Sequence, residues 1–439
     1  MFRLPVILLL LLSLLAAGCV SVDEEARQAM MDLHAGKFEE ARRWSEELAT
    51  ESHYTKRLGK VEAGRINMLG GDLPRSESWF RQALDEAIER NESGSVIKLS
   101  DVGNTVLSST VTDDRTMEYY LQPYEINLAL EYAILVQEAL GKREDALVDA
   151  RLAVYVQDTL AETYGADIAK SQESAAKNGT AMKICREADA TTMEAMMATR
   201  NSWENPVLWW LTGVLFEANG EKEMALQSYR KAAAILPENT VFANDLLRAE
   251  KGAWQERGKA RLAIVCQEGL VPMRQSLKVP VPVYTGMAID IPVYKDERIA
   301  PRQIAIREVS DAGKGAVAAS PGNDIQALAY RDLKERLPGI VVRNLTRCAT
   351  AAAAQAAVNS AGNDYAQIGM IVANSVAAAI RRADTRSWRS LPVHEQVWSD
   401  NTLSPGDHDF LVDFGAGSRA IKVNLKAGET KIIYVSILD

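Results

Sequence analysis

Residues 203–240 constrain the fold more than any other stretch of this 439-residue chain. Aromatic and small residues recur there at helical spacing on two faces: Trp209, Gly213 and Phe216, then Ala225, Tyr229 and Ala232. Asn219-Gly220 separates the two sets, and such a pair ends helices because both residues tolerate the left-handed conformation. Pro237 follows and ends the second helix. The pattern predicts two antiparallel helices that approach closely at the small residues.

The order of aromatic, Gly, aromatic, Ala, aromatic, Ala and Pro in this stretch resembles the tetratricopeptide repeat. The resemblance implies stacked helical hairpins, each of which buries an apolar face of the next and which together leave a groove. It also implies that the chain binds other molecules rather than transforming them.

Three earlier stretches carry weaker forms of the same pattern. They cover roughly residues 24–52, 55–92 and 124–163, with framework residues Gly36, Ala41, Gly64, Phe80, Ala83, Gly141 and Ala146. Between the second and third repeats we expect a helix over Val96–Leu107 and then a loop. A further helix is expected to reach Lys177, where Asn178-Gly179 interrupts it.

The N-terminus has the pattern of a signal peptide. Arg3 precedes an apolar run over Leu4–Leu15 that is too short to span a membrane, and small residues follow it. The sequence Leu-Ala-Ala-Gly-Cys ending at Cys19 resembles the bacterial lipobox. The resemblance implies cleavage before Cys19 and its lipidation with acyl chains such as palmitate; the alternative is an ordinary secretory signal. Val20 rather than Asp after the cysteine resembles the outer-membrane class, so we expect a lipid anchor on the periplasmic face.

The composition changes at Gly258, from helical periodicity to a mixture of strand and helix patterns. Strands are expected over 261–266, 288–293 and 303–309, with an extended run at 277–283 that its prolines restrict to an edge. Helices are expected over 325–337, closed by Pro338-Gly339, then 340–361 and 364–382. From 383 onward, short alternating strands with glycine turns predict a small antiparallel module.

The predicted fold class is therefore α plus β in several domains. A signal peptide (1–18) precedes a helical repeat domain (19–257), an α+β domain (258–382) and a C-terminal antiparallel β module (383–439) that packs on it.

Composition narrows the function. Nucleic-acid binding needs a basic surface, and a net charge of −9 does not predict one. Neither the four histidines nor the cysteines have metal-site spacing, so no metal or other cofactor is expected. Cys185, Cys266 and Cys348 are wide apart in sequence, and both a disulfide and three buried thiols remain open. No nucleophile motif or phosphate loop is present, so we expect no catalytic residues and no enzyme.

Exposed aromatic residues are the remaining candidates for contact with a partner. Tyr119, Tyr120 and Tyr124 follow an expected loop and are candidates for a groove lining, with packing under that loop as the alternative. Trp388 and Trp398, near or within the C-terminal β module, are candidates for contact with a glycan or peptidoglycan.

The whole chain resembles a family of uncharacterised bacterial TPR-containing lipoproteins. The lipobox, the repeats, Glu268-Gly-Leu-Val-Pro272 and the stretch 384–392 carry this resemblance, which supplies no catalytic residues. Its implication is a scaffold that binds another cell-envelope protein through its hairpins, in cell-wall or secretion-machinery assembly. The alternatives are a peptidoglycan-binding lipoprotein that uses the C-terminal β module and, third, an envelope hydrolase.

Overall fold

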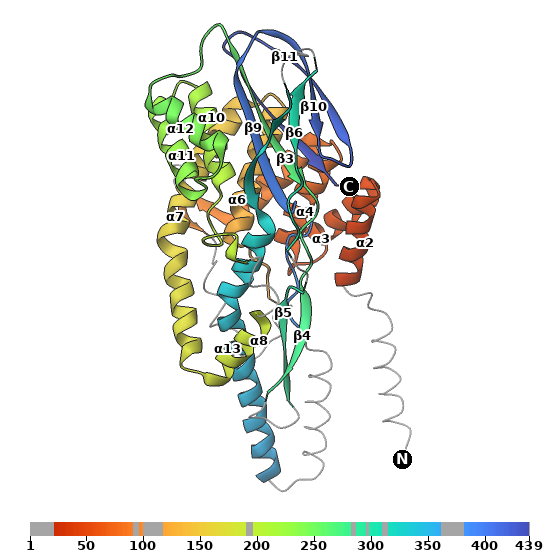
Figure 1. Cartoon of the computed structure of the whole chain (residues 1–439). Coiled ribbons are helices and arrows are strands. Elements are labelled where there is room, and N and C mark those ends of the chain that lie inside the picture. The colour runs from red at the N-terminus through yellow and green to blue at the C-terminus, as the bar shows by residue number, and fades with distance from the viewer. Residues whose placement is uncertain are drawn as a thin grey trace.

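The protein is described by a computed structural model that covers residues 22–90, 96–99, 117–189, 196–281, 287–295, 298–309, 315–360 and 382–438. It is a mixed α/β molecule, with helices in the N-terminal part and several sheets toward the C-terminus (Figure 1). The last described residue lies beside the first described helix, because His34 Nδ1 lies 2.7 Å from the carbonyl oxygen of Leu438.

Successive helices of the N-terminal half pack as antiparallel neighbours. They are α2 (Val22–His34), α3 (Phe38–Thr50), α4 (Lys56–Leu69), α5 (Leu73–Ala87), α6 (Pro123–Ala139), α7 (Arg143–Ala176), α8 (Gly179–Asp189), α10 (Pro206–Ala218), α11 (Lys222–Ile235) and α12 (Thr240–Glu250). Each contacts the next in sequence from α2 to α8 and from α10 to α12, and α10 also contacts α6 and α7. The apolar faces of α4–α7 and α10–α12 merge into one core that continues into the sheet, whereas α2 and α3 form one separate apolar cluster and α8 belongs to another.

Glycines permit the close helix contacts that the sequence predicts. A Cβ atom at Gly213 in α10 would lie 2.6 Å from the Tyr229 ring of α11. A Cβ atom at Gly64 in α4 would lie 2.7 Å from the Phe80 ring of α5. The ring therefore occupies the space of the missing side chain in both hairpins, and both rings are fully buried.

Three expected boundaries are wrong. Val96–Leu99 is not the start of a helix: it is strand β2, antiparallel to β1 (Ile88–Arg90). The rest of the helix expected to Leu107 lies outside the described residues. The expected helix end at Lys177 is confirmed, because Lys177 caps α7, but no boundary separates this helix from the third repeat near Thr163, so α7 is one helix of 34 residues.

The third wrong boundary is at Pro338. Helix α13 continues without a break from Ile325 to Ser360, and this proline lies inside it. An interior proline costs about 3 kcal/mol. Here the residues around it, Leu337, Val341 and Leu345, are buried against α8 and β5 (Ala288–Val293), and that packing offsets the cost. The helix expected over 364–382 falls almost entirely on residues that the structure does not describe.

Two four-stranded sheets form the C-terminal part. One has the order β12 (Thr430–Ile437), β3 (Ala260–Glu268), β9 (His394–Leu403), β8 (Ser320–Asp324). The other has the order β11 (Ser418–Leu425), β10 (Gly406–Asp413), β6 (Ala305–Glu308), β7 (Val317–Ala318). The expected edge run is β4 (Gln275–Pro280), which forms a separate hairpin with β5.

Strand β3 is the centre of a three-layer arrangement, and every one of its residues is buried. Ala263 and Val265 face the core of the helical half, whereas Leu262, Ile264 and Cys266 face the second sheet. A strand covered on both faces explains why its sequence is apolar without alternation.

The strands after residue 383 do not form a sheet of their own. β9 and β12 flank β3, and β10 pairs with β6, so both sheets mix them with earlier strands. Most of these pairings are antiparallel as expected, but β12 is parallel to β3, from Thr430 beside Arg261 to Ile437 beside Glu268. Strand β3 is hydrogen-bonded to a neighbouring strand on each edge. The alternation of residues within the terminal strands does not show which of them lies on which edge.

The Gly213 contact gives a stability prediction. Gly213→Ala should lower the free energy of unfolding by about 1–3 kcal/mol, because the new Cβ atom must displace a fully buried ring. Urea unfolding followed by circular dichroism measures this difference. The matched control is Gly258→Ala, whose Cβ atom has no heavy atom within 4 Å and should change stability by less than about 0.5 kcal/mol. Equal stability of the two variants would contradict the close approach.

Candidate functional site

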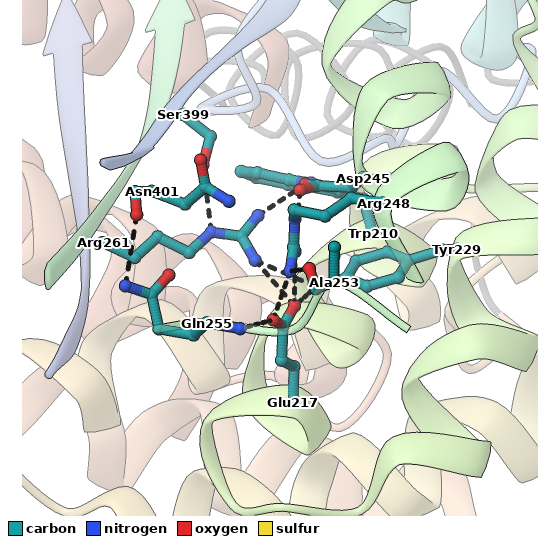
Figure 2. Close-up of polar contacts among 10 residues, drawn as sticks. All are labelled: Trp210, Glu217, Tyr229, Asp245, Arg248, Ala253, Gln255, Arg261, Ser399 and Asn401. Atoms are coloured by element: carbon teal, nitrogen blue, oxygen red, sulfur yellow. Dashed lines mark hydrogen bonds and ion pairs between the residues drawn. The ribbon is translucent and has the colours of Figure 1, made fainter. Parts of the chain in front are cut away.

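The boundary between the last helical hairpin and the sheet holds the polar groups most unlike an ordinary core. Arg261, near the start of β3, extends into the hairpin and is fully buried (Figure 2). Its guanidinium lies beside Glu217 at the end of α10 and Asp245 in α12. A buried guanidinium persists only with such partners, because an unpaired buried charge is strongly destabilising.

A closed set of hydrogen bonds surrounds Arg261. Nη1 donates to Glu217 Oε2 at 3.1 Å and to the Tyr229 hydroxyl at 3.0 Å, and Nε donates to Ser399 Oγ at 3.0 Å. Arg248 donates to both oxygens of Glu217, each at 2.6 Å. Figure 2 shows that the two guanidinium groups and the two carboxylates converge from α10, α12 and β3.

The two arginines and two carboxylates balance in charge. Burial alone would raise the pKa of Glu217, but the hydrogen bonds from Arg248 and the charge of Arg261 lower it to about 2. Burial alone would lower the pKa of Arg261, but the charge of Asp245 outweighs it and holds the pKa above its usual value. Glu217, Arg248 and Arg261 therefore stay charged at neutral pH, and the role of the network is to fix the hairpin against the sheet.

A cleft of about 650 Å³ opens away from this network, near the start of α10 and the start of β9, between the hairpin and the edges of both sheets. Its apolar wall comes from Pro206, Ile235, Leu236, Ile304 and Leu328. Edge strands β7 and β8 both border it. Asn239 donates to the carbonyl of Pro321, and the Thr240 and Ser320 hydroxyls lie 2.6 Å apart, so hairpin and β8 are joined beside the cleft.

His394, the first residue of β9, lines the cleft and is only 4% exposed. Its Nδ1 lies 3.6 Å from Glu268 and its Nε2 lies 3.7 Å from Asp324, distances beyond a hydrogen bond. Burial lowers the pKa of His394, and the charge of Asp324 offsets this only in part. The imidazole is therefore neutral at pH 7 and presents one donor and one acceptor at the cleft.

Two carboxyl groups, those of Glu131 and Glu395, lie together at the cleft wall, and Glu395 belongs to the cleft lining. Asn323, a cleft residue, donates to Glu395 at 2.6 Å and to Glu131 at 3.3 Å. Burial and the neighbouring charge of Glu395 raise the pKa of Glu131 well above its usual value. Asn205 Nδ2 donates to Glu131 at 2.7 Å and Gln267 donates to Glu395 at 3.0 Å, so this pair is held by amides and belongs to the support of the cleft wall.

The framework residues expected from the sequence lie mostly at helix contacts. Those buried at the hairpin cores are Ala41, Gly64, Phe80, Ala83, Ala146, Trp209, Gly213, Phe216, Ala225, Tyr229 and Ala232. Gly36 and Gly141 adopt positive φ angles at the turns, and Pro237 follows the end of α11. Cys19 lies outside the described residues.

The prediction that Trp388 and Trp398 contact a glycan is not supported by their positions, because both are buried. Trp388 has no exposed surface and packs against Phe80 and Tyr132, and Trp398 is 6% exposed against Phe410. A large apolar ring gains more by filling these gaps than by remaining on the surface.

The three candidate tyrosines also have little or only partial exposure. Tyr119 and Tyr124 are buried and donate to the carboxylate of Glu125. Tyr120 is partly buried under the guanidinium of Arg57, 4.4 Å from the ring centroid. Tyr119 and Tyr120 also line a cavity beside β5 and α13, so the expectation of a groove lining stays open for them. The loop expected before them lies outside the described residues. The cysteines Cys185, Cys266 and Cys348 are buried thiols.

Sequence reasoning missed Arg261 and His394. A charged residue at the start of an apolar strand is the signal for Arg261, but its partners Glu217 and Asp245 are indistinguishable from surface acids in the sequence. Nothing local marks His394, because Glu268 and Asp324 come from β3 and β8.

Within the described residues, no cluster of three or more histidine, cysteine or acidic side chains has metal-site geometry. None of the described helices is long and apolar enough to cross a membrane. Comparison with known proteins found no matching family model, curated protein or solved structure.

The Glu217 pKa predicts how stability depends on acid. A folded-state pKa of about 2, below the usual value of 4.5, means that Glu217 stabilises the fold above pH 4.5 and loses this effect as the pH falls toward 2. The stability difference between wild type and Glu217→Gln should thus shrink by up to about 3 kcal/mol over that range. Urea unfolding at successive pH values measures it.

The control is Glu223→Gln, on the exposed side of α11, which should follow the wild type at every pH. A constant difference between wild type and Glu217→Gln from pH 5 to pH 2 would show that Glu217 is not held ionised by Arg248 and Arg261.

Proposed function

We propose that the protein is a lipid-anchored scaffold on the periplasmic face of a bacterial outer membrane. It belongs with uncharacterised TPR-containing lipoproteins, and its helical hairpins form a TPR-like solenoid. Its role is to bind another cell-envelope protein, without catalysis, in cell-wall or secretion-machinery assembly. The lipobox ending at Cys19 supports the location, and the framework spacing supports the repeat class.

The cleft beside the last hairpin is the observation that carries the binding proposal. It combines an apolar wall, a buried imidazole and two sheet-edge strands within about 650 Å³. Edge strands offer backbone hydrogen bonds to an extended peptide, and apolar pockets select its side chains. We therefore take the partner's contact to be an extended segment that lies along β7 and β8.

The contacts that join the hairpin to β8 beside the cleft also support this role. Because Asn239 donates to the carbonyl of Pro321 and the Thr240 and Ser320 hydroxyls are bonded, the cleft walls are held at a set distance before any partner arrives. A preformed site loses less conformational entropy on binding. The peptidoglycan hypothesis has no comparable support, since Trp388 and Trp398 are buried.

Lipidation gives the first test. Cys19→Ser should move the protein from the membrane fraction to the soluble periplasm, because each buried acyl methylene contributes about 0.8 kcal/mol to anchoring. Cell fractionation with immunoblotting measures its distribution, and Cys185→Ser, which leaves the lipobox intact, is the control. Unchanged membrane association of Cys19→Ser would contradict the anchor.

Photo-crosslinking in living cells tests the cleft. A photoreactive amino acid at Leu236, in the cleft wall, should capture one envelope protein, whereas the same group at Leu247, 51% exposed on α12, should not. Adding Ala318→Arg, at the opposite wall, should reduce the Leu236 product at least tenfold by filling the cleft. Identical products at both positions, or none at Leu236, would reject the proposal.

A further inference from the structure

Two buried acidic side chains meet at the cleft wall, where α6, β8 and β9 come together. Glu131 of α6 has no exposed surface, and Glu395, the second residue of β9, is 1% exposed. The side-chain nitrogen of Asn323 donates to both of them, at 3.3 Å to Glu131 Oε2 and at 2.6 Å to Glu395 Oε2. The two carboxyl groups therefore share one donor and are direct neighbours.

The other donors to this pair are also uncharged amides. Asn205 Nδ2, at the N-cap of α10, donates to Glu131 Oε2 at 2.7 Å, and Gln267 Nε2 of β3 donates to Glu395 Oε1 at 3.0 Å. Arg65 of α4 is the cation whose charge acts on both carboxyl groups. Its Nη1 donates to Gln267 Oε1 at 2.7 Å, so this charge reaches the pair through an amide.

One carboxyl oxygen marks where a proton belongs. Glu131 Oε1 is buried and receives no hydrogen bond from the surrounding amides. A protonated carboxyl group is a donor, so a proton on Glu131 can be given to Glu395. Burial, the charge of Glu395 and the hydrogen bond between the two groups all raise the pKa of Glu131 well above its usual value. The same hydrogen bond favours the ionised form of Glu395, which is thus the acceptor.

The surroundings oppose a second negative charge. Two carboxylates in one buried site repel each other, and only the charge of Arg65 compensates them. The hydroxyl of Tyr132, also in α6, faces Glu395, and burial and the charge of Glu395 raise its pKa, so this group stays neutral. In the unfolded chain, by contrast, water solvates both carboxylates at neutral pH. Folding at neutral pH therefore takes up one proton at this site.

We propose that Glu131 and Glu395 hold one proton between them and that this proton joins β9 to the helical half at the cleft wall. Its release to solvent leaves two adjacent carboxylates, which repel each other across the junction. Because Asn323 and Glu395 both line the cleft, the wall is firmly joined while the proton is present and loosens when it is lost at higher pH.

Urea unfolding at successive pH values tests the shared proton. The folded protein keeps a proton that the unfolded chain releases above pH 4.5, so the pair stabilises the fold fully below pH 4.5 and less as the pH rises. Glu131→Gln supplies an amide donor to Glu395 that does not titrate. The unfolding equilibrium constant of the wild type, relative to that of Glu131→Gln, should therefore rise by up to about tenfold per pH unit from pH 5 to pH 7.

A second variant and a control complete the experiment. Glu395→Gln removes the other member of the pair, should lose the same pH dependence, and replaces Glu131→Gln if that variant does not fold. Glu223→Gln, exposed on α11, should follow the wild type at every pH. A ratio between wild type and the pair variants that stays constant from pH 5 to pH 8 would overturn the proposal.

Infrared spectroscopy provides a reading on the folded wild type alone. The carbonyl stretch of a protonated carboxyl group, which is resolved from the carboxylate bands, should persist at pH 7 and lose intensity in Glu131→Gln. Absence of this band from the wild type at pH 7 would equally overturn the shared proton.

Discussion

Burial of charged side chains between the helical half and the sheet is the constraint on which the rest of the fold depends. Arg261 reaches from β3 to Glu217 and Asp245, and Arg65 reaches from α4 to Gln267 at 2.7 Å. Removing one partner of a buried pair costs about 3–5 kcal/mol, because the other charge remains buried. The helices and the sheet are therefore stable only in one relative position, and the cleft between them has a defined shape.

The segment before β9 shows how far this dependence extends. Glu62 in α4 accepts the backbone amides of Arg389 and Ser390 at 2.6 and 3.1 Å, and Glu125 in α6 accepts that of Trp388 at 3.1 Å. Burial raises the pKa of Glu62 to about 7, although the amides and Arg389 oppose it. An irregular segment can cross the core only where such acceptors satisfy its amides.

Local signals predicted the helices well and the long-range pairings poorly. Glycine and proline punctuation located most of the hairpins, because left-handed turns and missing amide donors act within a few residues. The prediction at Pro338 was wrong because contacts with α8 and β5 keep α13 helical across the proline. The prediction for Trp388 was wrong because the space that its ring fills lies between residues of α5 and α6. The parallel partner of β12 is likewise set by β3, 169 residues earlier in the register. For the candidate site, sequence indicated the hairpin wall but neither His394 nor its carboxylate neighbours.

Helix α13 connects the two cavities. It begins at the cleft, where Asp324 accepts the amide of Ala327 and lies beside His394, and Leu328 lines the cleft wall. Two turns later, about 12 Å along the axis, Arg336 lines a second cavity, of about 140 Å³, between α13 and β5. Close packing means that an axial shift of one helix moves both linings together. A ligand in one cavity changes the affinity of the other cavity only if it binds more tightly to one axial position of α13 than to the other. The coupling free energy is the same whichever ligand binds first. The interior proline of α13, Pro338, lies between Arg336 and Arg343, at the point where such a helix bends most easily.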